Sequence, residues 1–287
     1  MQQPMPGRPP SRKTPFPEGG LPGSPSDLVR CLYTDPIWAA YAIADLQPEM
    51  AGDCRWLMAA GADGDAVALI YRGLYPPILW TMGDPQQLAA LLEGEELPPA
   101  IYVSVREEHL PVVSRHFDLR GDIRPMLRMV LDDKEAALHP APAGAAPVRL
   151  AGAQTEDVLR LLAHGGPFSP DAFSPAQIDQ GVFFGVYAAA DGASGEAPEL
   201  VAVGGTHIVD RAAGIAAIGN MYTHPAHRRR GHCAAILSAL VRELLALGLH
   251  TIVLNVDQRN PGAQALYQKH GFAVHLPYIE GKGHRDA

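Results

Sequence analysis

The sequence predicts an α/β (α+β) protein built as two tandem domains, each with a mixed central sheet flanked by helices. Two observations indicate this arrangement. Strand and helix patterns follow one another in the same order twice, as three strands, a helix, a strand, a helix and a strand. A low-complexity segment rich in Pro and Ala, residues 139–147, separates the two series. Such a segment is typical of an interdomain linker, because it offers few side chains to a core.

The start of the chain does not have the composition of a folded segment. Residues 1–26 hold many Pro and Gly residues and few apolar side chains. Because such a segment buries too little surface to offset the entropy of ordering it, we expect a disordered tail. The first domain is then expected at residues 27–138, and the second at residues 148–287.

The first domain opens with a helical pattern at residues 36–46, which strand patterns follow. A turn rich in Gly and Asp, at residues 61–65, separates the first two strands. Asp84 and Pro85 indicate a helix start, because Asp caps free N–H groups and Pro suits the first helical position. The expected elements are strands at 55–60, 66–71 and 77–82, a helix at 84–92, a strand at 101–105, a helix at 107–117 and a strand at 126–131.

The second domain repeats this order after its own short strand and helix. The pattern at 231–247 predicts the longest helix, with apolar residues at helical spacing and Gly248 at its end. Asn260 and Pro261 start the last helix as cap and first residue, and Gly271 ends it. The expected elements are a strand at 148–150, a helix at 155–162, strands at 183–189, 200–208 and 215–222, the helix at 231–247, a strand at 251–256, a helix from 260 to 271 and a strand at 272–276.

Composition argues against several classes of protein. No apolar run reaches about eighteen residues, so we expect no membrane span, and no apolar segment near the N-terminus indicates a secretory signal. The three cysteines follow no metal or disulfide spacing, which fits a reducing cytoplasm and no metal site. The net charge of −8 argues against a general nucleic-acid binder. We therefore expect a cytoplasmic monomer or homodimer in which any anion site is local.

The segment from Tyr222 to Ala234 is the most informative about chemistry. A strand passes into the basic turn Arg228-Arg229-Arg230-Gly231, which leads directly into an amphipathic helix. The first N–H groups of a helix have no internal partners, and the helix dipole favours negative charge there. Glycine lets the backbone approach an anion closely, and arginines add charge-assisted hydrogen bonds. The pattern predicts a pyrophosphate site.

Two segments resemble the hallmarks of one superfamily. Arg228-Arg229-Arg230-Gly231-His232-Cys233 resembles the diphosphate-binding motif Arg/Gln-x-x-Gly-x-Gly/Ala of the GNAT (GCN5-related N-acetyltransferase) superfamily, with Cys233 as a departure at the last position. Residues 260–272 resemble the family's second motif, Asn-x-x-Ala-x-x-Leu-Tyr-x-x-x-Gly-Phe. Either motif alone is weak, but both occur in the family's order. The resemblance covers residues 148 to about 278, and it is closest to the FR47-like acyltransferases, including Gly219-Asn220.

This resemblance implies that acyl-CoA, in the first instance acetyl-CoA, lies between two parallel strands that splay apart, at 215–222 and 251–256. The pantetheine is expected to pair with the backbone of residues 221–223 as an added strand. An N–H near Met221 or Tyr222 would stabilise the oxyanion as a deprotonated amine attacks the thioester. The residues implied for the cofactor are Met221, Tyr222, Thr223, Arg228, Arg229, Arg230, Gly231, His232, Cys233, Ala234, Asn255, Asn260 and Tyr267.

The resemblance also implies a general acid. Tyr267 matches the position from which the family donates a proton to the leaving CoA thiolate. The base that deprotonates the amine is left open, and His207 and His224 are the candidates. Cys233 has no partner base in the sequence pattern, so we do not expect it to act as a nucleophile.

The first domain lacks the basic turn. Its matching segment, residues 81–87, places Asp84 where arginines would be needed. Because an acid there would repel a pyrophosphate, we expect a degenerate copy that binds no CoA and helps to shape the acceptor pocket. Residues 168–184, with their aromatic side chains and prolines, are expected to line that pocket.

Three functions follow from these patterns. The first is an N-acyltransferase that moves an acetyl or short acyl group from CoA to a primary amine, on a small molecule or a peptide. The second is an acyl-CoA sensor or pseudoenzyme, which the departure at Cys233 and the undetermined base allow. The third, a nucleic-acid contact at the arginine turn, is opposed by the net charge of −8.

Overall fold

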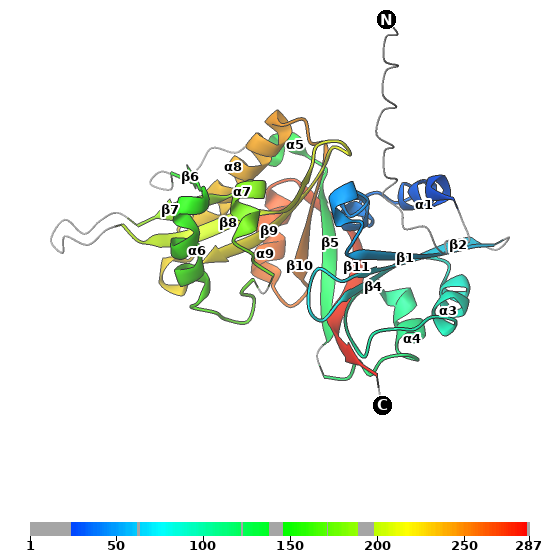
Figure 1. The fold of residues 1–287 in the computed structure, drawn as a ribbon. Coiled ribbons are helices and arrows are strands. Elements are labelled where there is room, and N and C mark those ends of the chain that lie inside the picture. Colours follow the sequence, from blue (N-terminus) through cyan, green and yellow to red (C-terminus); the bar gives the residue numbers. More distant parts are fainter. Residues whose placement is uncertain are drawn as a thin grey trace, which may run out of the picture.

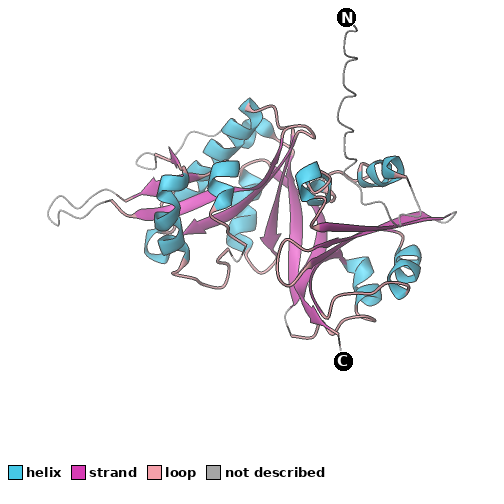
Figure 2. Ribbon diagram, in the orientation of Figure 1, coloured by secondary structure: helices cyan, strands magenta, loops and turns pink. Residues whose placement is uncertain are grey.

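The computed structural model describes residues 24–61, 64–121, 123–137, 146–170, 172–188 and 198–285. Most of the predicted tail and most of the predicted linker lie outside these residues, and the domain boundaries stay predictions. Within the described residues, an eleven-stranded mixed sheet runs through the molecule (Figure 1). Helices cover both faces of this sheet (Figure 2).

The first half supplies five strands and short helices. The strands are β1 (Cys54–Gly61), β2 (Gly64–Tyr71), β3 (Ile78–Gly83), β4 (Ala100–Arg106) and β5 (Ile123–Leu131). The helices are α1 (Pro25–Leu32), α2 (Ala40–Ala44), α3 (Pro85–Glu93), α4 (Leu110–Val113) and α5 (Lys134–Ala137), with 3-10 turns at Pro48–Met50 and Glu107–His109.

Three helices of this half differ from the sequence-based expectation. Helix α1 begins inside the segment predicted as a tail, where Ser24 and Asp27 form a capping box before Leu28 and Leu32 enter the core. The helix predicted at 36–46 is reduced to α2. The helix predicted at 107–117 is reduced to a 3-10 turn and α4, because Pro111 has no N–H with which to continue a helix from residue 107.

Within the described residues, the second half supplies six strands and four helices. The strands are β6 (Val148–Arg149), β7 (Phe184–Tyr187), β8 (Leu200–Asp210), β9 (Ile215–Thr223), β10 (Thr251–Asp257) and β11 (Phe272–His284). The helices are α6 (Thr155–Leu162), α7 (Ala176–Gln180), α8 (His232–Ala246) and α9 (Pro261–Lys269), with 3-10 turns at Gly152–Gln154 and Pro225–His227.

The strand order shows that the two halves exchange their last strands. The order is β1-β2-β3-β4-β11-β5-β10-β9-β8-β7-β6. β11 of the second half pairs with β4 of the first, and β5 of the first half pairs with β10 of the second. β5 and β11 also pair with each other, antiparallel, where the halves meet (green and red in Figure 1). Each half therefore completes its sheet with a strand from the other.

β11 is longer than the strand predicted at 272–276, because it pairs with two neighbours. Its first part lies against β5, and its last part, from Tyr278 to His284, also lies against β4. The last part alternates with polar residues such as Glu280 and Lys282, so it lacks the apolar pattern that indicates a buried strand.

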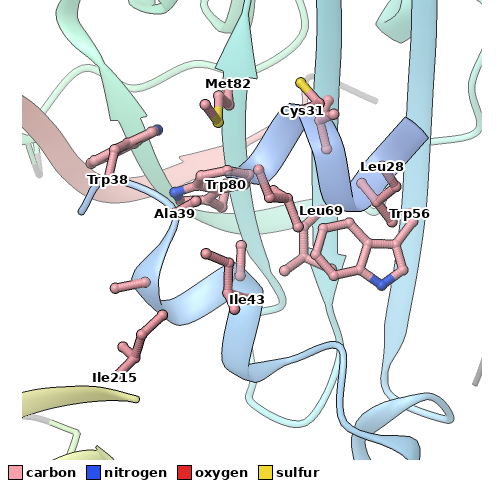
Figure 3. Packing of buried hydrophobic residues seen from close by; sticks show 14 of the residues in the cluster. Leu28, Cys31, Trp38, Ala39, Ile43, Trp56, Leu69, Trp80, Met82 and Ile215 are labelled. Carbon is pink, nitrogen blue, oxygen red and sulfur yellow. The ribbon is translucent and has the colours of Figure 1, made fainter. Parts of the chain in front are cut away.

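Four hydrophobic clusters hold the helices to the sheet. The cluster under α1 and α2 contains Trp38, Trp80 and Met82 (Figure 3) and also reaches Ile215 and Ala217 of β9. The opposite face of the first half packs on α3 and α4. In the second half, α8 and α9 cover one face and α6 and α7 cover part of the other. Helix α2 thus packs on the face of β9 that carries Ile215 and Ala217, which is opposite to the face covered by α8.

Candidate functional site

Two parallel strands separate at their carboxyl ends. β9 and β10 pair from Ile215–Thr251 to Ile218–Leu254. Beyond these positions β9 stays with β8, whereas β10 stays with β5. The separation confirms the geometry expected of strands 215–222 and 251–256, and it opens between Gly219 and Asn255.

A β-bulge lies in β9 at the point of separation. Gly219 is paired with Gly205 and Tyr222 with Val203, so β9 has one more residue than β8 between these pairs. Asn220 in the bulge has a φ of 53°, in the left-handed region. A bulge removes backbone groups from the regular ladder and re-aims them. The interrupted stretch includes Met221, whose neighbourhood was predicted to bind pantetheine.

The basic turn after β9 has the geometry of an anion-binding backbone concavity. Arg229 and Gly231 have φ angles of 63° and 82°, which places two nearby residues in the left-handed region. Successive N–H groups converge in such a conformation. Gly231 then begins α8 without any side-chain cap. The first N–H groups of α8 are therefore not covered by a side chain from the cap position.

The three arginines of this turn differ in position. Arg228 Nε donates a hydrogen bond to the Thr223 carbonyl at 3.1 Å. Arg230 Nη2 donates to the Ala226 carbonyl at 3.3 Å. Arg228 and Arg229 line the large cavity described next, whereas Arg230 does not. Two of the three arginines of the turn therefore line the cavity, and the third does not.

A cavity of about 1620 Å³ extends from this turn, through the separation of β9 and β10, to the face covered by α2. Phe168, Pro170 and Gln177, from the segment expected to line an acceptor pocket, lie along it. Of the residues predicted to contact the cofactor, those that line the cavity are Met221, Tyr222, Thr223, Arg228, Arg229, Gly231, His232, Cys233, Ala234, Asn255, Asn260 and Tyr267.

The candidate acid, Tyr267, lines this cavity, and its surroundings keep its hydroxyl protonated. Tyr267, on α9, is buried, and burial together with the nearby Cys233 raises the pKa of its hydroxyl well above the usual value. Burial also raises the pKa of the Cys233 thiol to about 12. Both groups keep their protons at neutral pH, which suits Tyr267 as a proton donor and not Cys233 as a nucleophile. Asn260 caps α9, accepting from Ala263 N at 3.1 Å.

The two candidate bases are placed differently. His207, on β8, lies over Gly219 so closely that a Cβ there would be 2.3 Å from His207 Nε2. Its Nδ1 shares a hydrogen bond of 3.1 Å with the hydroxyl of Tyr41 on α2. His224 does not line the cavity. Its Nδ1 accepts from Ala226 N at 3.2 Å, and its ring meets that of His164 edge-on at 4.3 Å.

The environment of His224 also disfavours its charged form. Burial, followed by the neighbouring His164 and His227, lowers the pKa of this imidazole. Its observed contacts are those of a residue that holds the turn after β9. Of the two histidines, His207 is therefore the one that reaches the separated strands.

Sequence reasoning missed the polar residues that the first half brings to the cavity. Tyr41, Asp45, Arg128 and Glu280 all line it. Arg128 stands in the apolar strand Met126-Leu127-Arg128-Met129, and a lone charge in a buried strand is the signal that could have found it. Asp45 follows α2 without any such signal, and burial raises its pKa to about 7.

Several buried polar atoms along the cavity have no hydrogen-bond partner within the described residues. They are the Oδ1 atoms of Asn220 and Asn255, Nδ1 of His232, and Nε and Nη1 of Arg128. Unpaired buried polar groups are rare in proteins and costly. Their position along one cavity fits a site that binds a polar molecule, and the open start of α8 fits the diphosphate of a CoA thioester.

The corresponding place in the first half is filled by the protein itself. β3 and β4 are also parallel, and their pairing ends at Trp80–Ser104 although both strands continue. Beyond this point Trp38 Nε1 donates to the Thr81 carbonyl at 2.9 Å, and His109 Nε2 donates to the Gly83 carbonyl at 2.9 Å. Figure 3 shows Trp38 beside Trp80.

The helix that follows β3 is also closed to a ligand. Asp84 Oδ1 accepts from the N–H groups of Gln86 and Gln87, each at 2.9 Å. A carboxylate of the chain therefore holds the place at the start of α3 that stays open at the start of α8.

Comparison with known proteins decides the family of the second half. Residues 159–272 match the model of the acetyltransferase (GNAT) family. This segment is a GNAT acetyltransferase domain. The match contains β9, the basic turn, α8 and the whole of α9, so the GNAT domain holds the separated strands and the open helix start.

Solved structures share the fold over both halves. A GCN5-related N-acetyltransferase from Kribbella flavida is 19% identical with a TM-score of 0.57, over 88% of this chain and 96% of that chain. A Drosophila protein is 16% identical with a TM-score of 0.63, over 91% of this chain and 96% of that chain. A GNAT-family protein from Novosphingobium aromaticivorans is 19% identical with a TM-score of 0.54, over 80% of this chain and 92% of that chain.

No curated protein matches the sequence. Among the described residues, no helix is both long and apolar enough to cross a membrane. The same residues contain no cluster of three or more His, Cys, Asp or Glu side chains placed to hold a metal ion.

Proposed function

We propose that this chain transfers an acetyl or short acyl group from acyl-CoA to a primary amine, which attacks the thioester directly. One observation carries the proposal: the separation of β9 and β10 and the uncapped start of α8 open into the same cavity. Together with the GNAT domain at residues 159–272, this arrangement supports acyl-CoA as the co-substrate.

The backbone and the basic turn would hold the CoA. The N–H groups at the start of α8, with Arg228 and Arg229, would bind the diphosphate, because they present positive charge at a helix N-terminus. The bulged stretch around Met221 would pair with the pantetheine as an added strand. Bound in this way, the thioester supplies an activated acyl group with a thiolate as its leaving group.

The amine would enter from the face covered by α2. There His207 lies over Gly219 at the separation of the strands, and its hydrogen bond to Tyr41 fixes the orientation of the ring. Imidazole is the side chain that most often serves as a general base near neutral pH. We therefore assign the role of base to His207, acting directly or through one water molecule.

Tyr267 would act from the other face. Its hydroxyl is held protonated by burial, so it can donate to the departing thiolate throughout the neutral range. The first half would bind no CoA, because Trp38, His109 and Asp84 occupy the corresponding backbone groups. It would instead form the wall of the acceptor side of the cavity.

The structure offers a matched pair of variants to test this function. Arg229→Gln removes a guanidinium that lines the cavity, whereas Arg230→Gln removes its neighbour, which does not. One charge-assisted hydrogen bond to a phosphate contributes about 1.5–3 kcal/mol, so Arg229→Gln should weaken CoA binding roughly ten- to a hundredfold. Arg230→Gln should change it less than about threefold.

Two measurements suffice. Calorimetry gives the affinity for CoA, and release of free thiol from acetyl-CoA over a panel of primary amines gives turnover. The proposal fails if the wild-type protein binds no CoA and releases no thiol with any amine. Equal loss of affinity in both variants would show that only net charge matters and would refute the assigned diphosphate site.

A further inference from the structure

Arg128 is a fully buried guanidinium that faces the acceptor side of the cavity. It comes from β5, the strand that the first half contributes beside β10. Only 1% of the surface of Arg128 is exposed. Its Nε and Nη1 have no hydrogen-bond partner within the described residues. An arginine does not lose its proton in proteins, so a permanent positive charge with unused donors lies beside the cavity.

Aromatic rings hold this side chain in place without satisfying its donors. The guanidinium carbon lies 4.8 Å from the ring centre of Tyr41, 5.4 Å from that of Trp38 and 5.8 Å from that of Tyr278. Such contacts stabilise the cation through the ring faces. They leave the edge of the guanidinium, where the N–H groups point, available for an acceptor atom.

Glu280, a carboxylate close enough to feel the charge of Arg128, makes its hydrogen bonds to other groups. Glu280 Oε1 accepts from the hydroxyl of Tyr278 at 2.7 Å, and its Oε2 accepts from that of Tyr102 at 3.0 Å. Its ion-pair contact is with Arg124 Nη2, at 3.9 Å. Burial raises the pKa of Glu280, and its hydrogen bonds and the charges of Arg124 and Arg128 lower it in part. Among the other acids on the cavity wall, Asp257 pairs with Arg259. No ion pair of the described residues joins Asp45 or Glu49 to Arg128.

Asn255 lies directly opposite Arg128 across the β10–β5 ladder. Facing residues of an antiparallel pair have Cβ atoms about 5 Å apart and point to the same side of the sheet. The Asn255 Oδ1 atom, on the first residue of β10 beyond its last pair with β9, is also buried without a partner. An unused acceptor and a set of unused donors therefore lie side by side, and the acceptor is the nearer of the two to the separated strands.

We infer that the acceptor is an amine that carries a carboxylate a few bonds away, as an α-amino acid does. Its carboxylate binds Arg128, and its amine lies beside Asn255 Oδ1 at the separation of β9 and β10, within reach of His207. Guanidinium and carboxylate match as a planar pair of hydrogen bonds. This inference rests on the proposed acyl transfer and names its substrate class.

The test compares amines that differ only in their carboxylate. Glycine, L-alanine and β-alanine are paired with their carboxamides, and each is measured with acetyl-CoA by thiol release and, without turnover, by the rise in melting temperature of the CoA-bound protein. We expect kcat/KM at least ~10-fold higher for the acids, because an unpaired buried cation penalises the neutral analogue. Stabilisation by the acids alone is expected in the binding measurement.

Arg128→Met provides the second readout. Removing a buried charge that lacks partners from the ligand-free protein should leave its melting temperature unchanged or raise it, whereas a merely structural arginine would lower it. In Arg128→Met the preference for acids should fall to ~1, while calorimetry should show CoA affinity within about threefold of wild type. Should Arg128→Met fail to fold, the paired amines on the wild-type protein still decide the matter.

Contrary outcomes are distinct. Equal or better use of the carboxamides would overturn the inference, as would a preference unchanged in Arg128→Met. A preference for succinyl-CoA over acetyl-CoA that is lost in Arg128→Met would assign the arginine to the acyl donor and overturn it as well. An absence of CoA binding in the wild-type protein would instead refute the proposed function. The same acids and amides, added to the protein without CoA, would then still report on Arg128 through its melting temperature.

Discussion

Replacing Tyr267 with Phe isolates the proton that the proposed acid supplies. The substitution removes one oxygen from a ring that is 6% exposed and that meets Phe272 edge-on at 6.3 Å, so packing is kept. Removal of a general acid costs about 10²–10⁴ in rate, or roughly 3–5 kcal/mol of barrier. We expect kcat to fall by this factor while CoA affinity and the melting temperature stay close to wild type.

The pH dependence sharpens this prediction. Because the pKa of Tyr267 lies well above its usual value, the hydroxyl stays protonated at every practical pH. A thiol with a pKa near ~8.5 needs no proton to depart once the pH exceeds that value. The ratio of wild-type to Tyr267→Phe rates should therefore shrink between pH 7 and pH 9.5, measured by thiol release at saturating amine.

A matched control comes from Tyr187, whose hydroxyl donates to Asp157 Oδ2 at 2.9 Å and does not line the cavity. Tyr187→Phe should leave kcat unchanged. A Tyr267→Phe enzyme with wild-type kcat at pH 7 would refute the acid role, and a loss of CoA affinity that explains the whole defect would show that the hydroxyl serves binding alone.

Two further predictions test the acceptor side of the cavity. Gly219→Ala would place a Cβ 2.3 Å from His207 Nε2 and displace the ring, so turnover should drop at least ~10-fold with little change in CoA affinity. The control is Gly94→Ala, where a Cβ meets nothing within 4 Å. Normal turnover in Gly219→Ala would refute the placement of His207. The folded-state pKa of Asp45 is raised from 3.8 to about 7, so the folded protein loses stability as the pH rises through this window. Asp45→Asn should remove this loss, stabilising the protein by up to about 4 kcal/mol at pH 8, so its melting temperature should rise at pH 8 and not at pH 4. An equal shift at both pH values would contradict the interpretation of Asp45 as a buried acid.

Much of the second half could be predicted because its signals are local. The turn before α8 needs a glycine with a left-handed φ, and the chain supplies Gly231 there. Asn260 and Pro261 indicate the start of α9 in the same way. These signals depend on a few neighbouring residues, so a single sequence displays them. All the residues predicted to contact the cofactor except Arg230 line the cavity, and their contact with a cofactor stays a prediction.

The exchange of strands had no such signal. β5 and β11 each follow a helix of their own half, and nothing in their side-chain patterns states which neighbour they join. The acceptor side of the cavity depends on this exchange, because β5 carries Arg128 to the edge of β10. Tyr41 and Trp38 were likewise part of a predicted helix, and only the packing of α2 on both halves gives them their roles.

The filled slot in the first half has a consequence for evolution in the laboratory. Trp38 and His109 donate to carbonyls that a bound ligand would otherwise have to satisfy, and the Asp84 carboxylate accepts from free N–H groups at the start of α3. These backbone groups are therefore satisfied permanently by the protein itself. Building a cofactor site into this half would require clearing a tryptophan from the middle of a shared core, so variants with a second site should be far harder to obtain than new specificities at the open slot of the second half.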